Sequence, residues 1–164
     1  MPNITIRQAE EADAPAILTL LQSVALWLET DGPGKLWPAS SFNLAEIAAK
    51  AERSEIVVLT SGPDIAACMY IEDSDATFWP EALPGEALYL HKLAVDRAFA
   101  GQGLARRLID WAAQHAARHG RKYLRLDCAP RPRLVQVYRD AGFERVGEDS
   151  IIEGFLVARL QRTL

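Results

Sequence analysis

Apolar residues recur along this 164-residue chain with two spacings, and the spacing at each point predicts the local element. Spacings of three and four residues predict helices, because they gather apolar side chains on one helix face. Short runs of alternating or continuous apolar residues predict strands. The expected helices cover residues 13–29, 44–52 and 103–119, with a short one leading into Phe143. The expected strands cover residues 4–7, 55–59, 65–71, 88–95, 123–128, 143–146 and 152–160.

Cap and turn residues mark the ends of several of these elements. We expect Asp13 to be the N-cap of the first helix, with Pro15 in its first turn. Residues 31–34, Asp-Gly-Pro-Gly, break the chain after that helix. Ser61-Gly-Pro-Asp64 is a strong turn signal and predicts that the strands on either side of it are joined directly.

The segment from Leu88 to Ala105 carries the most specific chemical signal. It predicts a strand, a turn containing Gly101 and Gly103, and then a long helix. Such a turn leaves backbone N–H groups unpaired at the positive end of a helix, which is a phosphate-binding arrangement. Arg106 stands where a dinucleotide-binding turn has its third glycine, and the lysine of a P-loop is absent. Taken alone, the glycine pair could also be a plain turn.

Two motifs in this part of the chain resemble those of the GNAT superfamily of N-acetyltransferases. Residues 100–105, Ala-Gly-Gln-Gly-Leu-Ala, resemble its pyrophosphate loop, Q/R-x-x-G-x-G/A, with Ala100 in place of Gln or Arg. Tyr138-Arg-Asp-Ala-Gly142-Phe143 resembles the Tyr-x-x-x-Gly-Phe that ends its coenzyme-binding core. The order and spacing of the two are more specific than either alone, so the chain is identified as a member of this superfamily.

The resemblance implies a fold, a domain organisation and a co-substrate. The implied fold class is α/β (mixed α+β), with a twisted mixed sheet of about seven strands and helices on both faces. In this superfamily the central strands splay apart and admit the pantetheine arm. Residues 1–164 are expected to form a single N-acetyltransferase domain whose acetyl-CoA-binding core covers about 88–147. The co-substrate is acetyl-CoA, and no metal is expected.

The resemblance also implies the residues that bind the coenzyme and protonate its sulfur. Tyr138 matches the tyrosine that faces the coenzyme sulfur, and its proposed role is the acid that protonates the leaving thiolate; it could otherwise simply be a packed aromatic residue. Backbone amides near the thioester would polarise the carbonyl oxygen. The implied coenzyme-binding residues are Leu93, Ala94, Val95, Gly101, Gln102, Gly103, Leu104, Ala105 and Arg106.

The base that deprotonates the acceptor is less clear from the sequence. His91 lies on the strand that leads to the loop, and imidazole ordinarily titrates near neutrality, which suits proton abstraction. Serotonin N-acetyltransferase, a member of the superfamily, has a similar strand with histidines at the positions that match Tyr89 and His91. A lone histidine in a strand is more often a packed or capped side chain than a catalyst. Glu86, Glu72 or a chain of water molecules could act instead.

Charge and composition agree with a polyanionic ligand. Residues 97–139 hold ten Lys or Arg residues and only two acidic ones, whereas the rest of the chain carries a net charge of about −12. That acidic remainder would repel a long polyanion, so we expect no nucleic-acid partner. No apolar run is long enough for a membrane span, and the start lacks the layout of a signal peptide. Cys68 and Cys128 are expected to be reduced thiols, in a cytoplasmic protein.

Other groups of polar residues are weaker candidates for chemistry. His115 and His119 stand four residues apart, but a core residue and a helix-end cation explain them better than a zinc site. Asp73 and Asp75 are expected to be turn residues. Trp37 and Trp79, each followed by proline, could line an acceptor pocket or anchor loops.

These observations predict an acetyl-CoA-dependent N-acetyltransferase. The acceptor is expected to be a primary amine of a small molecule or a peptide, which attacks the acetyl group directly. Transfer of another acyl group, or transfer to a hydroxyl, stays open. A non-catalytic acyl-CoA-binding sensor also stays open, because Ala100 and Arg131 depart from the superfamily's usual residues. The sequence does not name the acceptor or decide whether the chain forms a homodimer.

Overall fold

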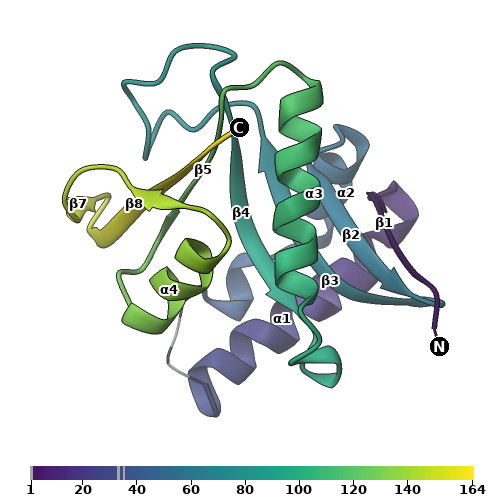
Figure 1. Ribbon diagram of the computed structural model, residues 1–164. Helices are drawn as coiled ribbons and strands as arrows, with labels where there is room; N and C mark the ends of the chain where they lie inside the picture. The colour runs from purple at the N-terminus through teal and green to yellow at the C-terminus, as the bar shows by residue number, and fades with distance from the viewer. Residues whose placement is uncertain (1, 33, 35) are drawn as a thin grey trace. The chain divides into compact units, whose positions relative to one another are not determined.

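The computed structural model describes residues 2–32, 34 and 36–164 (Figure 1). The chain forms two compact units, Met1–Tyr70 with Lys92–Leu108, and Ile71–His91 with Ile109–Leu164. The strands are β1 (Ile4–Gln8), β2 (Ile56–Ser61), β3 (Asp64–Glu72), β4 (Ala87–Val95), β5 (Tyr123–Cys128), β6 (Glu144–Arg145), β7 (Ser150–Ile152) and β8 (Phe155–Thr163). The α-helices are α1 (Ala14–Thr30), α2 (Leu44–Glu52), α3 (Leu104–Arg118) and α4 (Pro132–Asp140).

The strands are hydrogen-bonded in the order β1-β2-β3-β4-β5-β8-β6, and β7 pairs with β8. Only the pairing of β4 with β5 is described as parallel; the pairs β1–β2, β2–β3, β5–β8, β6–β8 and β7–β8 are antiparallel. The expected α/β (mixed α+β) fold class is therefore confirmed, with eight strands where about seven were expected. None of the described helices is long and apolar enough to cross a membrane.

The first unit is built on the antiparallel strands β1, β2 and β3. Alternate residues of β2 and β3, including Ile56, Val58 and Cys68, pack with the buried faces of α1 and α2 in one cluster. The residues between them, such as Val57 and Leu59, are also fully buried, so β2 is covered on both faces. The expected turn at 61–64 is confirmed, because Ser61 pairs with Asp64 where β2 meets β3.

The helix starts of this unit differ in part from the expectation. Asp13 does occupy the N-cap position of α1, but its carboxylate makes no cap bond. It accepts instead from both terminal nitrogens of Arg7, at 2.7 and 3.0 Å, and from the backbone N–H of Glu10. At α2, Asn43 is the N-cap residue, and its side-chain oxygen accepts a hydrogen bond from Glu46 N at 2.9 Å. The predicted break at 31–34 includes Pro33, which lies outside the described residues.

The second unit holds the parallel pair and the chain's last strands. Ala87–Tyr89 of β4 pair with Tyr123–Arg125 of β5, whereas β5 pairs with β8 along its whole length. The expected strand over 152–160 proves to be two, because Glu153 and Gly154 both have positive φ and turn the chain between β7 and β8. Trp79, Ala87 and Tyr89 form a small core at the parallel pair. The prediction that residues 1–164 form a single N-acetyltransferase domain stays a prediction.

Candidate active site

The loop between β4 and α3 has the backbone shape that its glycines predict. The Asp96 carboxylate accepts from Ala98 N at 2.9 Å and starts a short 3-10 turn over Arg97–Phe99. Gly101 and Gly103 follow with φ of 77° and 73°, in the left-handed region that only glycine enters without cost. The chain then runs directly into α3, whose residues Leu104 and Leu108 are buried. The loop is therefore attached to a packed helix.

The backbone N–H groups at the end of this loop have no acceptor in the described part of the chain. Among the described residues, no hydrogen bond is donated by the N–H groups of residues 101–105, and the first helical bond there is Arg107 N to Gly103 O. A Cβ added at Gly101 or Gly103 would meet no atom within 4 Å. Open space thus lies beside Gly101 and Gly103, at the positive end of a 15-residue helix, with Arg106 and Arg107 exposed on its first turn.

The end of β4, which holds Leu93, Ala94 and Val95, follows an irregular residue. Lys92 has φ of 54°, which is uncommon for a residue with a side chain and interrupts the regular strand. Ala94 is buried, and Leu93 and Val95 are half-buried. The strand end is held in the first unit by Asp96 N, which donates to Ala66 O at 2.8 Å. Nothing in the sequence around Lys92 marks this irregularity.

Tyr138 lies near the end of α4 in a half-buried position. Its ring meets the ring of Phe143 edge to face, with centroids 5.9 Å apart, so two residues of the Tyr-x-x-x-Gly-Phe motif contact each other. Burial, with smaller contributions from Cys128 and Asp127, raises the pKa of the Tyr138 hydroxyl well above its ordinary range. The hydroxyl therefore stays protonated at neutral pH, which is the state that a proton donor needs.

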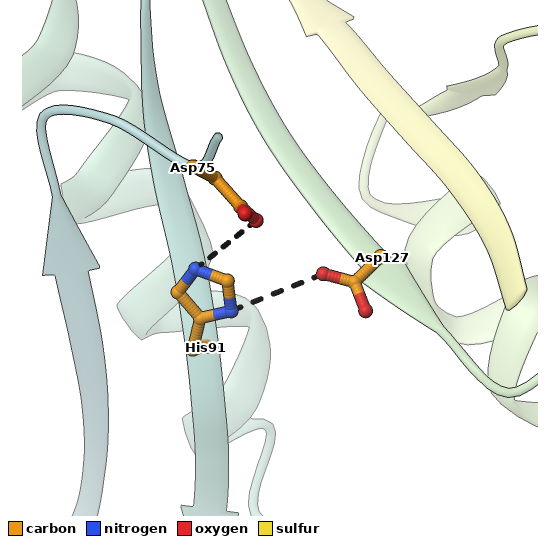
Figure 2. A group of neighbouring side chains, drawn as sticks. All are labelled: Asp75, His91 and Asp127. Atoms are coloured by element: carbon orange, nitrogen blue, oxygen red, sulfur yellow. Dashed lines mark ion pairs between the residues drawn. The ribbon is translucent and has the colours of Figure 1, made fainter. Parts of the chain in front are cut away.

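His91 lies between two carboxylates (Figure 2). Its Nε2 is 3.5 Å from Asp75 Oδ2, and its Nδ1 is 3.9 Å from Asp127 Oδ1. The imidazole is half-buried, and both carboxylates are more buried than it is. Asp75 is also the turn residue that was expected, because its Oδ1 accepts from Phe78 N at 3.0 Å. No sequence pattern indicates a function for Asp127 or a second role for Asp75.

The parallel pairing of β4 with β5 explains why Asp127 lies beside His91. Tyr89 pairs with Arg125 at the last backbone pair of β4 and β5, and two residues further along each strand stand His91 and Asp127. Side chains two residues apart share a face of a strand. The contact with Asp75 crosses from the segment after β3, and no local sequence pattern predicts it.

Glu86, one of the alternative bases, already accepts hydrogen bonds from the protein. Its Oε2 accepts from Arg125 Nη1 at 2.9 Å and from Leu83 N at 3.1 Å. The hydrogen bond from Arg125 is the main cause that holds the pKa of this carboxyl below its usual range. Arg125 is itself buried, with hydrogen bonds to Tyr89 and Gln161. It therefore anchors the segment before β4, although its charge was counted in the basic block assigned to a polyanion.

The aromatic and sulfur-containing candidates are placed inside the units. Trp79 is 2% exposed and packs against Tyr89, so it anchors its loop rather than presenting a surface to a ligand. Trp37 is half-buried, with Lys92 Nζ 5.4 Å from its ring centre. Cys68 and Cys128 are free and buried, and burial raises their thiol pKa values to about 12 and about 11. Both thiols are protonated at neutral pH and are poor nucleophiles.

Two groups of polar residues bear on metal binding. His115 stacks on Trp111 with ring centres 4.7 Å apart, and burial is the main cause that lowers its pKa, in agreement with a partly buried packing residue. One ligand atom from each of Asp75, His91 and Asp127 lies within 4.8 Å of the others, a spacing from which these residues could hold a metal ion. The two carboxylates face different nitrogens of the ring, however, so an ion on one nitrogen would require side-chain movement to reach both.

Comparisons with known proteins identify related chains over most of the length. Residues 42–164 match the family model of an acetyltransferase (GNAT) domain. The chain is 32% identical over 145 residues to an uncharacterized N-acetyltransferase, YesJ, of Bacillus subtilis, a match that covers 84% of this chain and 80% of that protein.

Solved structures extend the likeness to the whole fold. A GNAT-family acetyltransferase from Listeria monocytogenes is 26% identical, with a TM-score of 0.76 over 98% of this chain and 95% of its own. yncA from Salmonella typhimurium, solved with its cofactor acetyl-CoA, is 19% identical, with a TM-score of 0.75 over 99% and 94%.

Proposed function

Because the chain belongs to the GNAT family of acetyltransferases, we propose that it moves an acetyl group from acetyl-CoA to a primary amine of a small molecule or a peptide. The amine attacks the thioester directly, without a covalent enzyme intermediate. The observation that carries the proposal is the row of N–H groups at residues 101–105, which donate no hydrogen bond within the described chain. These donors are therefore available to a ligand, which supports the proposal.

The diphosphate of coenzyme A suits these donors. Two adjacent phosphates need several N–H groups aimed at one place, and the positive end of α3 favours their charge. The proposed phosphate-binding residues are Gly101, Gln102, Gly103, Leu104, Ala105 and Arg106. The acetyl-CoA in the yncA structure supports this ligand for a chain of the same fold.

The remaining roles follow from the chemistry of acetyl transfer. A protonated amine must lose a proton before it attacks, and we assign His91 as the base that accepts this proton. Negative charge develops on the carbonyl oxygen, and the backbone N–H groups of residues 93–95 are assigned to stabilise it. Tyr138 is assigned to protonate the thiolate that leaves, since its pKa is raised and its hydroxyl stays protonated.

The compartment of the reaction is also part of the proposal. Cys68 and Cys128 are both free and buried, which supports a reducing compartment, the cytoplasm. Transfer of another acyl group, or transfer to a hydroxyl, is the alternative within enzymes.

Thiol release from acetyl-CoA, measured with a panel of alkylamines, amino acids and peptides, tests the proposal. We expect acceptor-dependent release of coenzyme A above the rate without acceptor, with the acetylated product identified by mass spectrometry. Calorimetry with coenzyme A runs alongside. Binding of the coenzyme without release of thiol for any acceptor would make the chain an acyl-CoA sensor, as Ala100 and Arg131 leave open. Absence of binding would remove the assignment altogether.

A further inference from the structure

The cluster around His91 has a rigid side at Asp75 and a wider gap, 3.9 Å against 3.5 Å, at Asp127. On the rigid side, the Oδ1 atom of Asp75 accepts from Phe78 N, and the backbone of Asp75 accepts from Trp79 N at 2.9 Å. Trp79 is buried against Tyr89, so the turn that carries the carboxylate is fixed in the second unit. The Asp75 side chain is only 7% exposed. Its second oxygen, Oδ2, is therefore held in one place.

The position of this second oxygen favours a proton on Nε2 of His91. Asp75 Oδ2 is buried and makes no hydrogen bond within the described chain. A buried carboxylate oxygen without a donor is costly, and an ion pair joins this oxygen to His91 Nε2 at 3.5 Å (Figure 2). A proton on Nε2 would satisfy it after a small rotation of the ring. Catalytic hydrogen bonds are often this long before the substrate is bound.

On the other side of the ring, Nδ1 and Asp127 Oδ1 lie 3.9 Å apart, too far for a direct hydrogen bond. A nitrogen donor placed between them can lie about 2.9 Å from each at the same time. The two carboxylates give the cluster a net negative charge whether or not the imidazole is protonated. This gap therefore suits a group that is a cation and carries at least two N–H donors.

We propose that Asp75, His91 and Asp127 form the acceptor site for a primary ammonium group, an inference that rests on the proposed function. Asp75 is a positioning residue that keeps the imidazole proton on Nε2 and leaves the lone pair on Nδ1. Asp127 and Nδ1 hold the ammonium by two hydrogen bonds. The acceptor class is accordingly a primary amine that is charged at neutral pH.

Protons and electrons balance in this scheme. The ammonium gives one proton to His91 Nδ1, and its lone pair then forms the C–N bond to the acetyl carbon. The C–S bond breaks, and the sulfur leaves as a thiolate that takes the proton of Tyr138. The second proton lost from the nitrogen restores Tyr138, and His91 releases its proton to solvent. The products are an amide, the free thiol of coenzyme A and one proton.

Kinetics with paired acceptors test the role of Asp127. Asp127→Asn should raise KM for an alkylammonium acceptor about 10- to 100-fold, the loss expected for a hydrogen bond to a charged group. KM for an arylamine that is neutral at the assay pH should change much less. Asp73→Asn removes the same charge from an exposed carboxylate that pairs with Arg121, and it should leave both values unchanged. Equal effects of Asp127→Asn on both acceptors would overturn the assignment.

Nitrogen NMR of the imidazole rings tests the role of Asp75 without any acetyl transfer. The chain has three histidines, so His91 can be assigned by its loss in His91→Gln. Wild-type His91 should show its proton on Nε2. In Asp75→Asn the new amide donates to Nε2 and the proton should move to Nδ1, while the oxygen that accepts from Phe78 N is kept. An unchanged tautomer would overturn the positioning role.

The same variants separate this inference from the proposed function. Asp75→Asn should lower kcat about 100-fold or more, because the lone pair moves to the wrong nitrogen, and should leave KM nearly unchanged. A wild-type chain that acetylates no amine contradicts the proposed function, whereas the NMR result stands independently.

Titration with Zn²⁺ tests whether the three residues bind a metal ion instead. Tight binding that displaces a proton from His91 and needs both carboxylates would identify a metal site instead and overturn the acceptor site.

Discussion

At the scale of single residues, Tyr138 combines a motif position with an environment that suits one proton transfer. Its ring is held against Phe143, and burial raises the pKa of its hydroxyl. A tyrosine whose pKa is raised keeps its proton throughout the neutral and mildly alkaline range. Loss of activity at high pH should therefore come from another group.

Tyr138→Phe removes this proton donor and keeps the ring. We expect kcat to fall about 100-fold or more, in the range that general acid catalysis contributes. Affinity for coenzyme A, measured by calorimetry, should change little, because the ring contact with Phe143 is retained. Tyr123→Phe is the matched control in the same unit, since the Tyr123 ring packs beside Arg125 and its hydroxyl makes no hydrogen bond within the described chain. Equal losses in both variants would argue against the acid role.

Site residues could be predicted from the sequence where the residues that mark them lie close together in the chain, and were missed where their partners lie far along the chain. Tyr138 could be selected because it belongs to a motif whose members are close in the chain. His91 could be proposed from its strand. Asp75 and Asp127 lie 16 residues before and 36 residues after His91 in the chain, and only the pairing of β4 with β5 and the turn before Trp79 bring them together.

At the scale of elements, the turn from β4 into α3 depends on two glycines in the left-handed region. A side chain at such a position strains the backbone by roughly 1 kcal/mol or more. Gly103 and Gly62 form a useful pair, because both have positive φ and neither would place a Cβ within 4 Å of another atom. The two positions differ in that Gly62 lies in the turn between β2 and β3 and is not part of the candidate phosphate loop.

Gly103→Ala should weaken coenzyme A binding about 10-fold or more, because two or more amide hydrogen bonds to the diphosphate are displaced. Gly62→Ala should reduce the melting temperature by a similar amount and leave the affinity for coenzyme A unchanged. Calorimetry and thermal unfolding of the two variants measure both quantities. If the two variants lost affinity equally, or neither did, the loop would not be the phosphate site.

Element boundaries were predictable where the sequence carried a local stop signal. The boundaries of α2 and β5 agree with the expectation at both ends, because Asn43 and Arg53 flank α2, whereas Lys122 precedes β5 and Pro130 follows it closely. The expectation of a single strand over 152–160 did not separate β7 from β8, because β7 has only three residues. Asp13 is the N-cap residue of α1 as predicted, but its carboxylate bonds Arg7 on strand β1 and no N–H group of the helix.

At the scale of the whole molecule, charge pairs of the same kind recur in both units. In the first unit, Asp13 bonds Arg7, and Glu55 bonds Arg53. In the second unit, Glu86 bonds Arg125. In each case a hydrogen bond from the arginine is the main cause that lowers the pKa of the carboxyl. Composition showed an acidic protein, but only the fold shows which carboxylates are paired.

The lowered pKa values set the sign of the pH dependence. A carboxyl with a lower pKa in the folded chain than in the unfolded chain binds fewer protons when folded. The stability that it contributes is therefore present above the unfolded value, near pH 4, and is lost as the pH falls through the folded value. Since such carboxyls occur in both units, we expect the melting temperature to fall steeply below about pH 4.

Asp13→Asn tests this at one pair whose geometry is bidentate. The variant should be less stable than wild type by roughly 1 kcal/mol at pH 7, since the pair with Arg7 is only partly exposed. The difference in melting temperature should shrink as the pH falls from 7 to 2.5, because the wild-type carboxyl takes up its proton as the pH passes through its lowered pKa. Glu29→Gln removes an exposed carboxylate from α1 and should have little effect at either pH. A deficit of the same size at both pH values would mean that Asp13 acts through packing and not through its charge.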